Sequence, residues 1–242
     1  MLIPSPRPTR EDLRIWAERD RLDNRLLDAR WPQITHAARI SRERIIAFAE
    51  ADPCFLGISW GKDSVVVAHL ASGLDGLPIV PVYFVHGARE NPDCKFVRDA
   101  FLARWPLPQY REQVVDARKA GDKTSKAARY ARWMREGGLP ERRITGVRAA
   151  ESKIRELSAW VHGASTETSC RPIIEWSTVD VFLYLKFHDL PVHPAYAQSM
   201  NGALDRDWLR VAPLGGSEGT GHGRAEWERR YYPDALRAIE AV

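Results

Sequence analysis

The residues with the clearest chemistry form one short run, Ser59-Trp60-Gly61-Lys62-Asp63-Ser64. It follows an apolar stretch typical of a strand and precedes a stretch typical of a helix, which predicts a loop whose backbone N–H groups face a phosphate. Gly61 lets the backbone approach a ligand, Lys62 adds a positive charge, and the hydroxyls of Ser59 and Ser64 can donate hydrogen bonds. A carboxylate beside phosphates repels them unless a cation lies between, so Asp63 predicts Mg²⁺.

A second run, residues 146–155, contains Gly146, Arg148, Glu151, Ser152 and Arg155. It follows a predicted strand, so its side chains are expected at the carboxyl edge of a sheet, where open α/β sheets bind ligands. Two arginines at this edge could hold phosphate or sulfate bidentately. A surface loop with an ion pair between Arg148 and Glu151 is the competing interpretation.

These runs together carry a resemblance. Residues 59–64 resemble the S-G-G-K-D-S pyrophosphate loop of the N-type ATP pyrophosphatases, the adenine nucleotide alpha-hydrolase-like superfamily that includes phosphoadenosine phosphosulfate (PAPS) reductases. Residues 146–155 resemble the G-x-R-x-x-E-S-x-x-R segment of the PAPS reductase-like branch, and residues 171–182 its P-[IL]-x-x-W-x-x-x-D-[VI]-[WF] stretch. The loop departs from a Walker A loop, because Asp63 follows Lys62 where Ser or Thr is required. Trp60 stands where the superfamily has Gly, which is expected to restrict the loop backbone.

The resemblance implies ATP as ligand, with Mg²⁺, and a set of site residues. It implies catalytic roles for Lys62, Asp63 and Arg148. It implies ATP contacts from residues 59–64, Gly146 and Arg148. Contacts to substrate or phosphate are implied for Glu151, Ser152, Arg155, Arg171 and His193.

The pattern of apolar residues predicts the elements that position this site. Alternation of strands with helices predicts an α/β fold with a doubly wound, mostly parallel five-stranded sheet, as in Rossmann-like proteins. We expect strands at 54–59, 79–86, 109–115, 142–147 and 173–174, and helices at 64–71, 91–105, 124–136 and 177–188. A capping box at Thr9 begins a first N-terminal helix that Pro32 ends, and a second helix runs from near Ile34 to Glu50. The predicted parts are a helical extension (1–51), the ATP pyrophosphatase domain (52–196) and a glycine-rich loop with a helical tail (197–242).

Composition excludes several classes of protein. The chain has 242 residues, 44% hydrophobic and 28% charged, which argues against a disordered chain. We see no apolar run long enough to cross a bilayer and no signal peptide, so a cytoplasmic protein without a membrane partner is the simplest interpretation. Three separated cysteines exclude a disulfide scaffold and an iron–sulfur cluster held by this chain alone.

Cysteine positions also bear on the reaction. PAPS reductases carry a nucleophilic cysteine in a C-terminal motif, and this chain has no cysteine after Cys170. Reduction of a sulfonucleotide by this chain alone is therefore disfavoured, and attack on the α-phosphorus of ATP is favoured. Cys170 itself is either a small buried residue or an acceptor of persulfide sulfur.

A predicted helix near the middle of the chain is strongly basic. Five Lys and Arg and no acidic residue lie between Lys123 and Arg135, in a chain of net charge +4. Basic residues recur at every third position, and an apolar stripe lies opposite: Lys126, Arg129, Arg132 and Arg135 against Ala127, Tyr130, Ala131 and Met134. This ridge, with Trp133 beside it, is either a solvated face or a contact surface for a DNA backbone.

Among superfamily members, this cysteine-poor chain most resembles the ATP pyrophosphatase component of bacterial DNA phosphorothioation systems of the Ssp type. That resemblance implies adenylation of a DNA backbone phosphate for sulfur insertion, in anti-phage defence, with a cysteine desulfurase as sulfur donor. A homodimer is compatible with the sequence. The alternatives are a sulfate or FMN adenylyltransferase, a sulfonucleotide reductase, and a nucleotide-binding assembly subunit without turnover.

Overall fold

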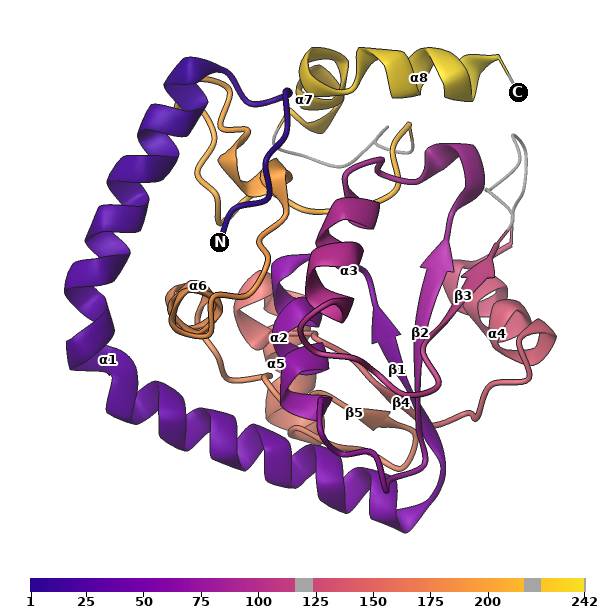
Figure 1. The fold of residues 1–242 in the computed structure, drawn as a ribbon. Helices are drawn as coiled ribbons and strands as arrows, with labels where there is room; N and C mark the ends of the chain where they lie inside the picture. The colour runs from indigo at the N-terminus through magenta and orange to yellow at the C-terminus, as the bar shows by residue number, and fades with distance from the viewer. Residues whose placement is uncertain (116–123, 216–222, 242) are drawn as a thin grey trace.

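A five-stranded parallel sheet forms the centre of the protein in the computed structural model, which describes residues 1–115, 124–215 and 223–241 (Figure 1). The strands are β1 (Cys54–Ile58), β2 (Ile79–Val85), β3 (Arg111–Val114), β4 (Arg143–Ile144) and β5 (Ser169–Cys170). Their order is β3-β2-β1-β4-β5, and all neighbouring pairs are parallel. The predicted doubly wound α/β fold is confirmed.

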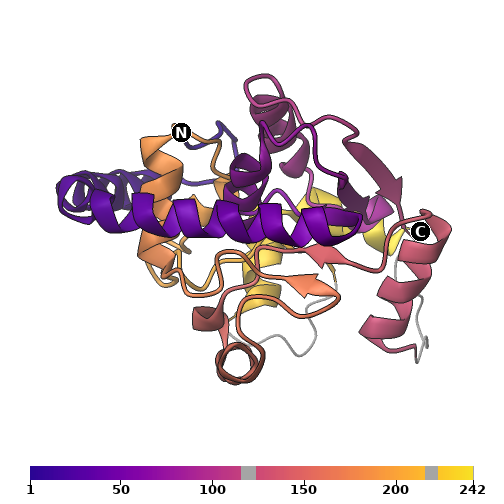
Figure 2. The ribbon, with the colours of Figure 1, turned by 90° about the horizontal axis from the view of Figure 1, so that it is seen from below.

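Helices cover both faces of this sheet. They are α2 (Lys62–Ala71), α3 (Cys94–Leu102), α4 (Lys126–Glu136), α5 (Lys153–His162) and α6 (Thr178–Phe187), with short 3-10 turns η1 (Gly87–Arg89), η2 (Ala149–Glu151) and η3 (Pro194–Ala197). Figure 2 shows α3 and α4 on opposite sides of the strands. Neighbouring strand residues alternate between these sides: Phe55, Val82 and Phe84 pack with Met134 of α4, whereas Leu56 and Tyr83 belong to the larger core with α2 and α3.

The fifth strand lies four residues earlier than predicted. Ile173 and Ile174 are buried but form a turn, in which the Ile174 N–H donates to the Arg171 carbonyl at 3.1 Å. Pro172 has no N–H to give to a strand ladder. Instead the Thr145 N–H donates to the carbonyl of Cys170 at 2.9 Å, so Ser169 and Cys170 pair with β4. Apolar character alone did not distinguish a buried turn from a strand.

One long helix replaces the two predicted at the N-terminus. α1 (Arg10–Ala51) begins with the predicted capping box at Thr9 and contains Pro32 inside it. Figure 1 shows α1 turning a corner partway along its length, as expected where a proline removes one helical hydrogen bond. The helix continues through Pro32 because residues on both sides of this proline pack: Trp31 stacks on Phe187 of α6 at 3.4 Å between ring centroids, and Ile34 is buried.

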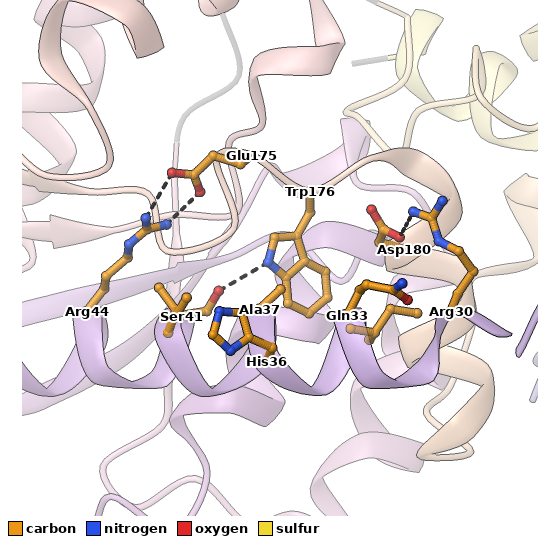
Figure 3. A pocket seen from close by; sticks show the side chains of 11 residues that line it. Arg30, Gln33, His36, Ala37, Ser41, Arg44, Glu175, Trp176 and Asp180 are labelled. Carbon is orange, nitrogen blue, oxygen red and sulfur yellow. Dashed lines mark hydrogen bonds and ion pairs between the residues drawn. The ribbon is translucent and has the colours of Figure 1, made fainter. Parts of the chain in front are cut away.

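A groove with a volume of about 340 Å³ lies between α1 and the segment leading into α6 (Figure 3). The Trp176 indole lines it and donates to the Ser41 hydroxyl at 3.2 Å. Arg44 pairs with Glu175, and Arg30 pairs with Asp180. These contacts hold α1, on both sides of Pro32, against the chain that follows β5.

The C-terminal part returns to the first half of α1. It contains α7 (Arg224–Tyr231) and α8 (Pro233–Glu240), interrupted at Pro233 as predicted. Arg206 makes a bidentate, buried ion pair with Asp23 of α1, at 2.7 and 2.8 Å. The Ser199 and Tyr231 hydroxyls both donate to the carboxylate of Asp12 at 2.8 Å. Within the described residues no helix is both long and apolar enough to cross a membrane. The predicted glycine-rich loop falls partly outside the described residues.

Candidate nucleotide site

The predicted phosphate loop, residues 59–64, lies at the point where the strand order reverses. β1 ends at Ile58 and α2 begins at Lys62, so Ser59, Trp60 and Gly61 form the connection. The second run follows β4, the neighbour of β1 on the side away from β2. The ends of β1 and β4 therefore flank the crevice in which open α/β sheets bind ligands.

Hydroxyl groups close the loop from within. The Ser64 hydroxyl donates to the carbonyl of Gly61 at 3.0 Å and accepts the N–H of Ser59 at 3.2 Å. The Ser59 and Ser64 hydroxyl oxygens also lie 3.2 Å apart. The two serines predicted to contact ATP thus shape the loop in this structure.

Trp60 has a backbone conformation that favours glycine. Its φ is +56°, in the left-handed region that costs a non-glycine residue about 1–2 kcal/mol. Its ring is fully buried and packs against Tyr83, Phe101 and Tyr110. The side chain therefore points into the core, and its burial offsets the strain. The packing of this ring in the core holds the loop backbone in place, which agrees with the predicted restriction of the loop.

Asp63 joins the two cations of the site. One carboxylate oxygen lies 2.8 Å from Lys62 Nζ and the other 2.6 Å from Arg148 Nε. The Lys62 and Arg148 side chains are 0% and 1% exposed. Burial lowers the pKa of the Lys62 ammonium, and the Asp63 charge opposes that shift. The sequence-predicted catalytic trio is thus one buried cluster that ties the β1 loop to the chain after β4.

Gly146 makes that cluster sterically feasible. A Cβ at this position would lie 2.8 Å from the carbonyl carbon of Asp63 and 2.9 Å from its oxygen. No real Cβ approaches backbone so closely, so any other residue would push the β4 connection away from α2. The glycine in this run therefore serves the close approach of two chain segments.

Glu151 is a second carboxylate of the site that contacts several residues. Its carboxylate accepts the Arg148 N–H at 3.1 Å, pairs with Arg155, and lies 3.7 Å from Nε of Arg210. Ser152 caps α5 by accepting the Arg155 N–H. The ion pair predicted between Arg148 and Glu151 side chains is replaced by this backbone contact, while Arg155 takes the side-chain pairing.

Two further residues, Tyr196 and Arg210, belong to the site, and the sequence analysis did not predict either of them. The Tyr196 hydroxyl accepts the Lys62 N–H at 3.0 Å, and its ring lies 5.2 Å from Lys62 Nζ. Burial raises the pKa of this phenol, so it stays neutral. Arg210 comes from a segment without helical or strand periodicity, where no local pattern marks it. The proximity of Tyr196 to the His193-Pro194 pair was the available signal for the first of these.

Three predicted residues lie outside this set of contacts. The His193 imidazole is buried, its Nδ1 accepts the Ala195 N–H at 3.1 Å, and burial lowers its pKa to about 3. Arg171 donates to the Ser158 hydroxyl and the Gly163 carbonyl, and so holds the C-terminal end of α5. The Cys170 thiol is fully buried, and burial raises its pKa. The contacts seen here are structural, and ligand contacts of His193 and Arg171 and a sulfur-accepting role of Cys170 stay predictions.

The donor set does not fit a Mg²⁺ ion held by the protein. Both oxygens of Asp63 already accept from Lys62 and Arg148. Within the described ranges, His, Cys, Asp and Glu form no group of three that could hold a metal. Mg²⁺ at nucleotide sites is usually held by one or two carboxylates together with substrate phosphates, so only a site built from protein ligands alone disagrees with this geometry. A role of Asp63 as a Mg²⁺ ligand beside bound phosphates stays a prediction.

The basic ridge of α4 is only partly as predicted. Tyr130, Trp133 and Met134 pack against the sheet, so Trp133 is partly buried in the core contact. Ala131, expected on the apolar stripe, is exposed. Arg132 lies 3.7 Å from Glu136, and Arg135 is exposed. The contact with DNA stays a prediction.

Fold and site define a nucleotide-binding α/β protein with a phosphate loop after its first strand. The chain belongs to the phosphoadenosine phosphosulfate reductase domain family, whose model matches residues 53–202. It is 27% identical over 188 residues to the phosphoadenosine 5'-phosphosulfate reductase of Xylella fastidiosa strain M12, covering 67% of this chain and 76% of that one. The Synechococcus sp. reductase is also 27% identical, over 184 residues that cover 66% and 75%.

One solved structure is similar to this chain at a lower sequence identity than these reductases. It is a U34-tRNA thiolase from Methanococcus maripaludis, 13% identical, with a TM-score of 0.45 over 86% of this chain and 78% of that one.

Replacing Trp60 tests how the loop is built. Trp60→Ala removes a fully buried ring and keeps the strained φ, so we expect a loss of about 3–5 kcal/mol in the free energy of unfolding. Trp60→Gly leaves the same cavity but relieves the strain, and should be about 1 kcal/mol more stable than Trp60→Ala. Urea denaturation of both variants measures the difference; a glycine variant less stable than the alanine variant would contradict the left-handed conformation.

Proposed function

We propose that this chain is an ATP pyrophosphatase that adenylates an oxygen of its substrate. The observation that carries the proposal is the buried cluster of Lys62, Asp63 and Arg148 at the sheet crevice, with Arg155 and Arg210 beside it. Phosphoryl chemistry of this kind needs little from the protein except position and charge compensation, which such a cluster supplies. The substrate oxygen attacks the α-phosphorus, the bond from that phosphorus to the bridging oxygen breaks, and pyrophosphate leaves with the electron pair.

The residues divide into positioning and binding groups. Lys62 Nζ lies at the start of α2, where the positive end of the helix dipole adds to its charge. Asp63 and Arg148 position Lys62 and the two loops around it. Tyr196 fixes the Lys62 backbone, because its hydroxyl accepts the Lys62 N–H. A nucleotide phosphate placed on this loop meets positive charge that the protein has already oriented.

We propose further that the acceptor is a phosphate of the DNA backbone and that sulfur then takes the place of AMP. The three cysteines support an external sulfur donor, since Cys54, Cys94 and Cys170 are all buried. Burial raises the pKa of each of these thiols. A cysteine desulfurase in direct complex with this chain would supply the sulfur.

A sulfonucleotide reductase is the second candidate, favoured by the names of the relatives. The two candidates differ in the bond that is broken. An adenylating enzyme releases pyrophosphate from ATP, whereas a reductase needs an accessible thiolate to attack a sulfonucleotide. The buried thiols favour the first.

Lys62→Met tests the assigned reaction. The variant keeps the apolar stem over Tyr196 and removes the charge, so the release of pyrophosphate and AMP from ATP should fall about a hundredfold or more with the fold intact. Lys95→Met, a change at an exposed lysine of α3, is the matched control and should match the wild type. Chromatography of the nucleotide products and a pyrophosphate assay measure both. Wild-type conversion of ATP to ADP and orthophosphate would refute the assigned bond cleavage.

Replacing Arg129 and Arg132 of α4 by Ala tests the contact with DNA. Each lost phosphate contact reduces the steepness with which affinity falls with salt, so we expect weaker DNA binding and a flatter salt dependence, with ATP binding unchanged. Fluorescence anisotropy of a labelled duplex across a salt series measures this. An unchanged salt slope would make the ridge a solvated face.

Sulfur transfer is tested in cells that carry the whole modification pathway. The Lys62→Met variant should abolish phosphorothioate linkages, because the acceptor is no longer activated. The Cys170→Ala variant should retain them, because its thiol is buried and its pKa is raised. Mass spectrometry of digested DNA counts the linkages. Normal levels with Lys62→Met would exclude the DNA assignment, and loss with Cys170→Ala would show that sulfur passes through this chain.

A further inference from the structure

The buried guanidinium of the site, that of Arg148, is committed to protein partners. Arg148 donates through Nε to Asp63, through Nη1 to the Trp176 carbonyl at 3.1 Å, and through Nη2 to the Thr178 hydroxyl at 3.3 Å. All three guanidinium nitrogens are thus engaged in holding the β4 loop against α2 and α6. Arg148 is therefore a positioning residue, although its sequence context suggested a direct phosphate contact.

The half-exposed cations of the site differ from Arg148 in their exposure to solvent. Arg210 donates through Nη1 to the carbonyls of Asp207 and Leu209, at 2.6 and 3.0 Å, and its Nε lies toward Glu151. The Arg155 and Arg210 side chains are 43% and 40% exposed, and both face the single carboxylate of Glu151, which is 10% exposed. Two positive charges against one negative leave a surplus of one at this spot. The 3.7 Å separation between Arg210 Nε and Glu151 exceeds the 2.7–2.9 Å of a strong charged hydrogen bond. A phosphoryl oxygen could therefore bind Arg210 more tightly than this carboxylate does.

The chain places Arg210 against the phosphate loop. The Cβ of Val211, the next residue, lies 3.5 Å from where a Cβ on Gly61 would stand. Arg224 of α7 donates to the Arg210 carbonyl at 2.7 Å, and the Leu214 N–H donates to the Arg89 carbonyl at 2.7 Å. Contacts to the backbone at Arg210 and just after it thus fix the position of Arg210 beside Gly61, independently of its ion pair.

We propose that Arg155 and Arg210 form an anion subsite for a phosphoryl group beside the phosphate loop, with Glu151 occupying the two arginines until that group arrives. This proposal rests on the proposed function. Arg210 lies beyond the residues that the family model matches, so the subsite is completed by a segment outside the common domain. The phosphoryl group belongs either to the pyrophosphate part of ATP or to the phosphodiester that accepts the adenylate.

Calorimetry with three separate probes tests the subsite: inorganic pyrophosphate, AMP and a short DNA duplex. Arg155→Ala and Arg210→Ala should each weaken binding of pyrophosphate or of the duplex about fivefold to tenfold, and leave AMP unchanged. Arg229→Ala removes an arginine of α7 that is 71% exposed and is the matched control, expected to bind all three probes like the wild type. Thermal unfolding confirms that each variant is folded.

Glu151→Gln should change the affinity for the probe in the direction opposite to the two arginine variants. The amide oxygen can still accept the Arg148 N–H, but the negative charge that competes for the two arginines is gone, so binding of the same probe should tighten several-fold. A cluster that only stabilises the fold would weaken binding in this variant as well.

The outcomes separate the two sources of the phosphoryl group. A loss confined to pyrophosphate assigns the subsite to ATP, and a loss confined to the duplex assigns it to the acceptor. Unchanged affinities in both arginine variants, weaker binding with Glu151→Gln, or a wild type that binds neither pyrophosphate nor the duplex would overturn the proposal. The probes need no turnover, so failure of the wild type to cleave ATP would overturn the proposed function and leave this measurement valid.

Discussion

The carboxylate of Asp63, held between Lys62 and Arg148, is the interaction on which the rest of the site depends. It lies at 2.8 and 2.6 Å from two side chains that are almost fully buried. A buried cation without a partner is costly, and removing the carboxylate that pairs with such a cation destabilises a protein by about 3–5 kcal/mol. Asp63 therefore allows two cations to lie inside the fold, at the junction of the β1 and β4 connections. Without it, mutual repulsion and desolvation would separate those connections.

Backbone constraints follow from this contact. Arg148 can reach Asp63 only if the β4 connection touches the first turn of α2, and Gly146 provides the missing Cβ that this approach requires. On the other side, Trp60 holds the loop in a left-handed conformation through the packing of its ring. Glycine would permit that conformation, whereas the buried tryptophan enforces it. The loop of this chain is thus expected to be stiffer than a loop with two adjacent glycines.

Sequence reasoning located four of the five strands, the phosphate loop and the β4 segment because each has a local pattern. It assigned Arg148 to phosphate and Asp63 to Mg²⁺ because it treated each charge separately. In the structure these charges neutralise one another, a result that depends on the sheet order and on the approach at Gly146. The same limit explains His193 and Arg171, whose types suit anion binding but whose hydrogen bonds serve chain turns. Arg210 could not be found, because only the folded C-terminal segment brings it to Glu151.

Parts of the chain outside the family match complete the site through α1. Asp12 and Asp23, on the first half of this helix, bind Ser199 and Arg206 on the segment that leads to Arg210. Beyond Pro32, Ser41 and Arg44 bind the segment that leads to α6. Trp176 of that segment and Thr178 of α6 are the partners of Arg148. A straight helix of this length could not follow both surfaces. The bend thus lets one helix support both the buried cluster and the outer arginines. The domain that matches the family model supplies the loop, and α1 sets the position of the cations around that loop.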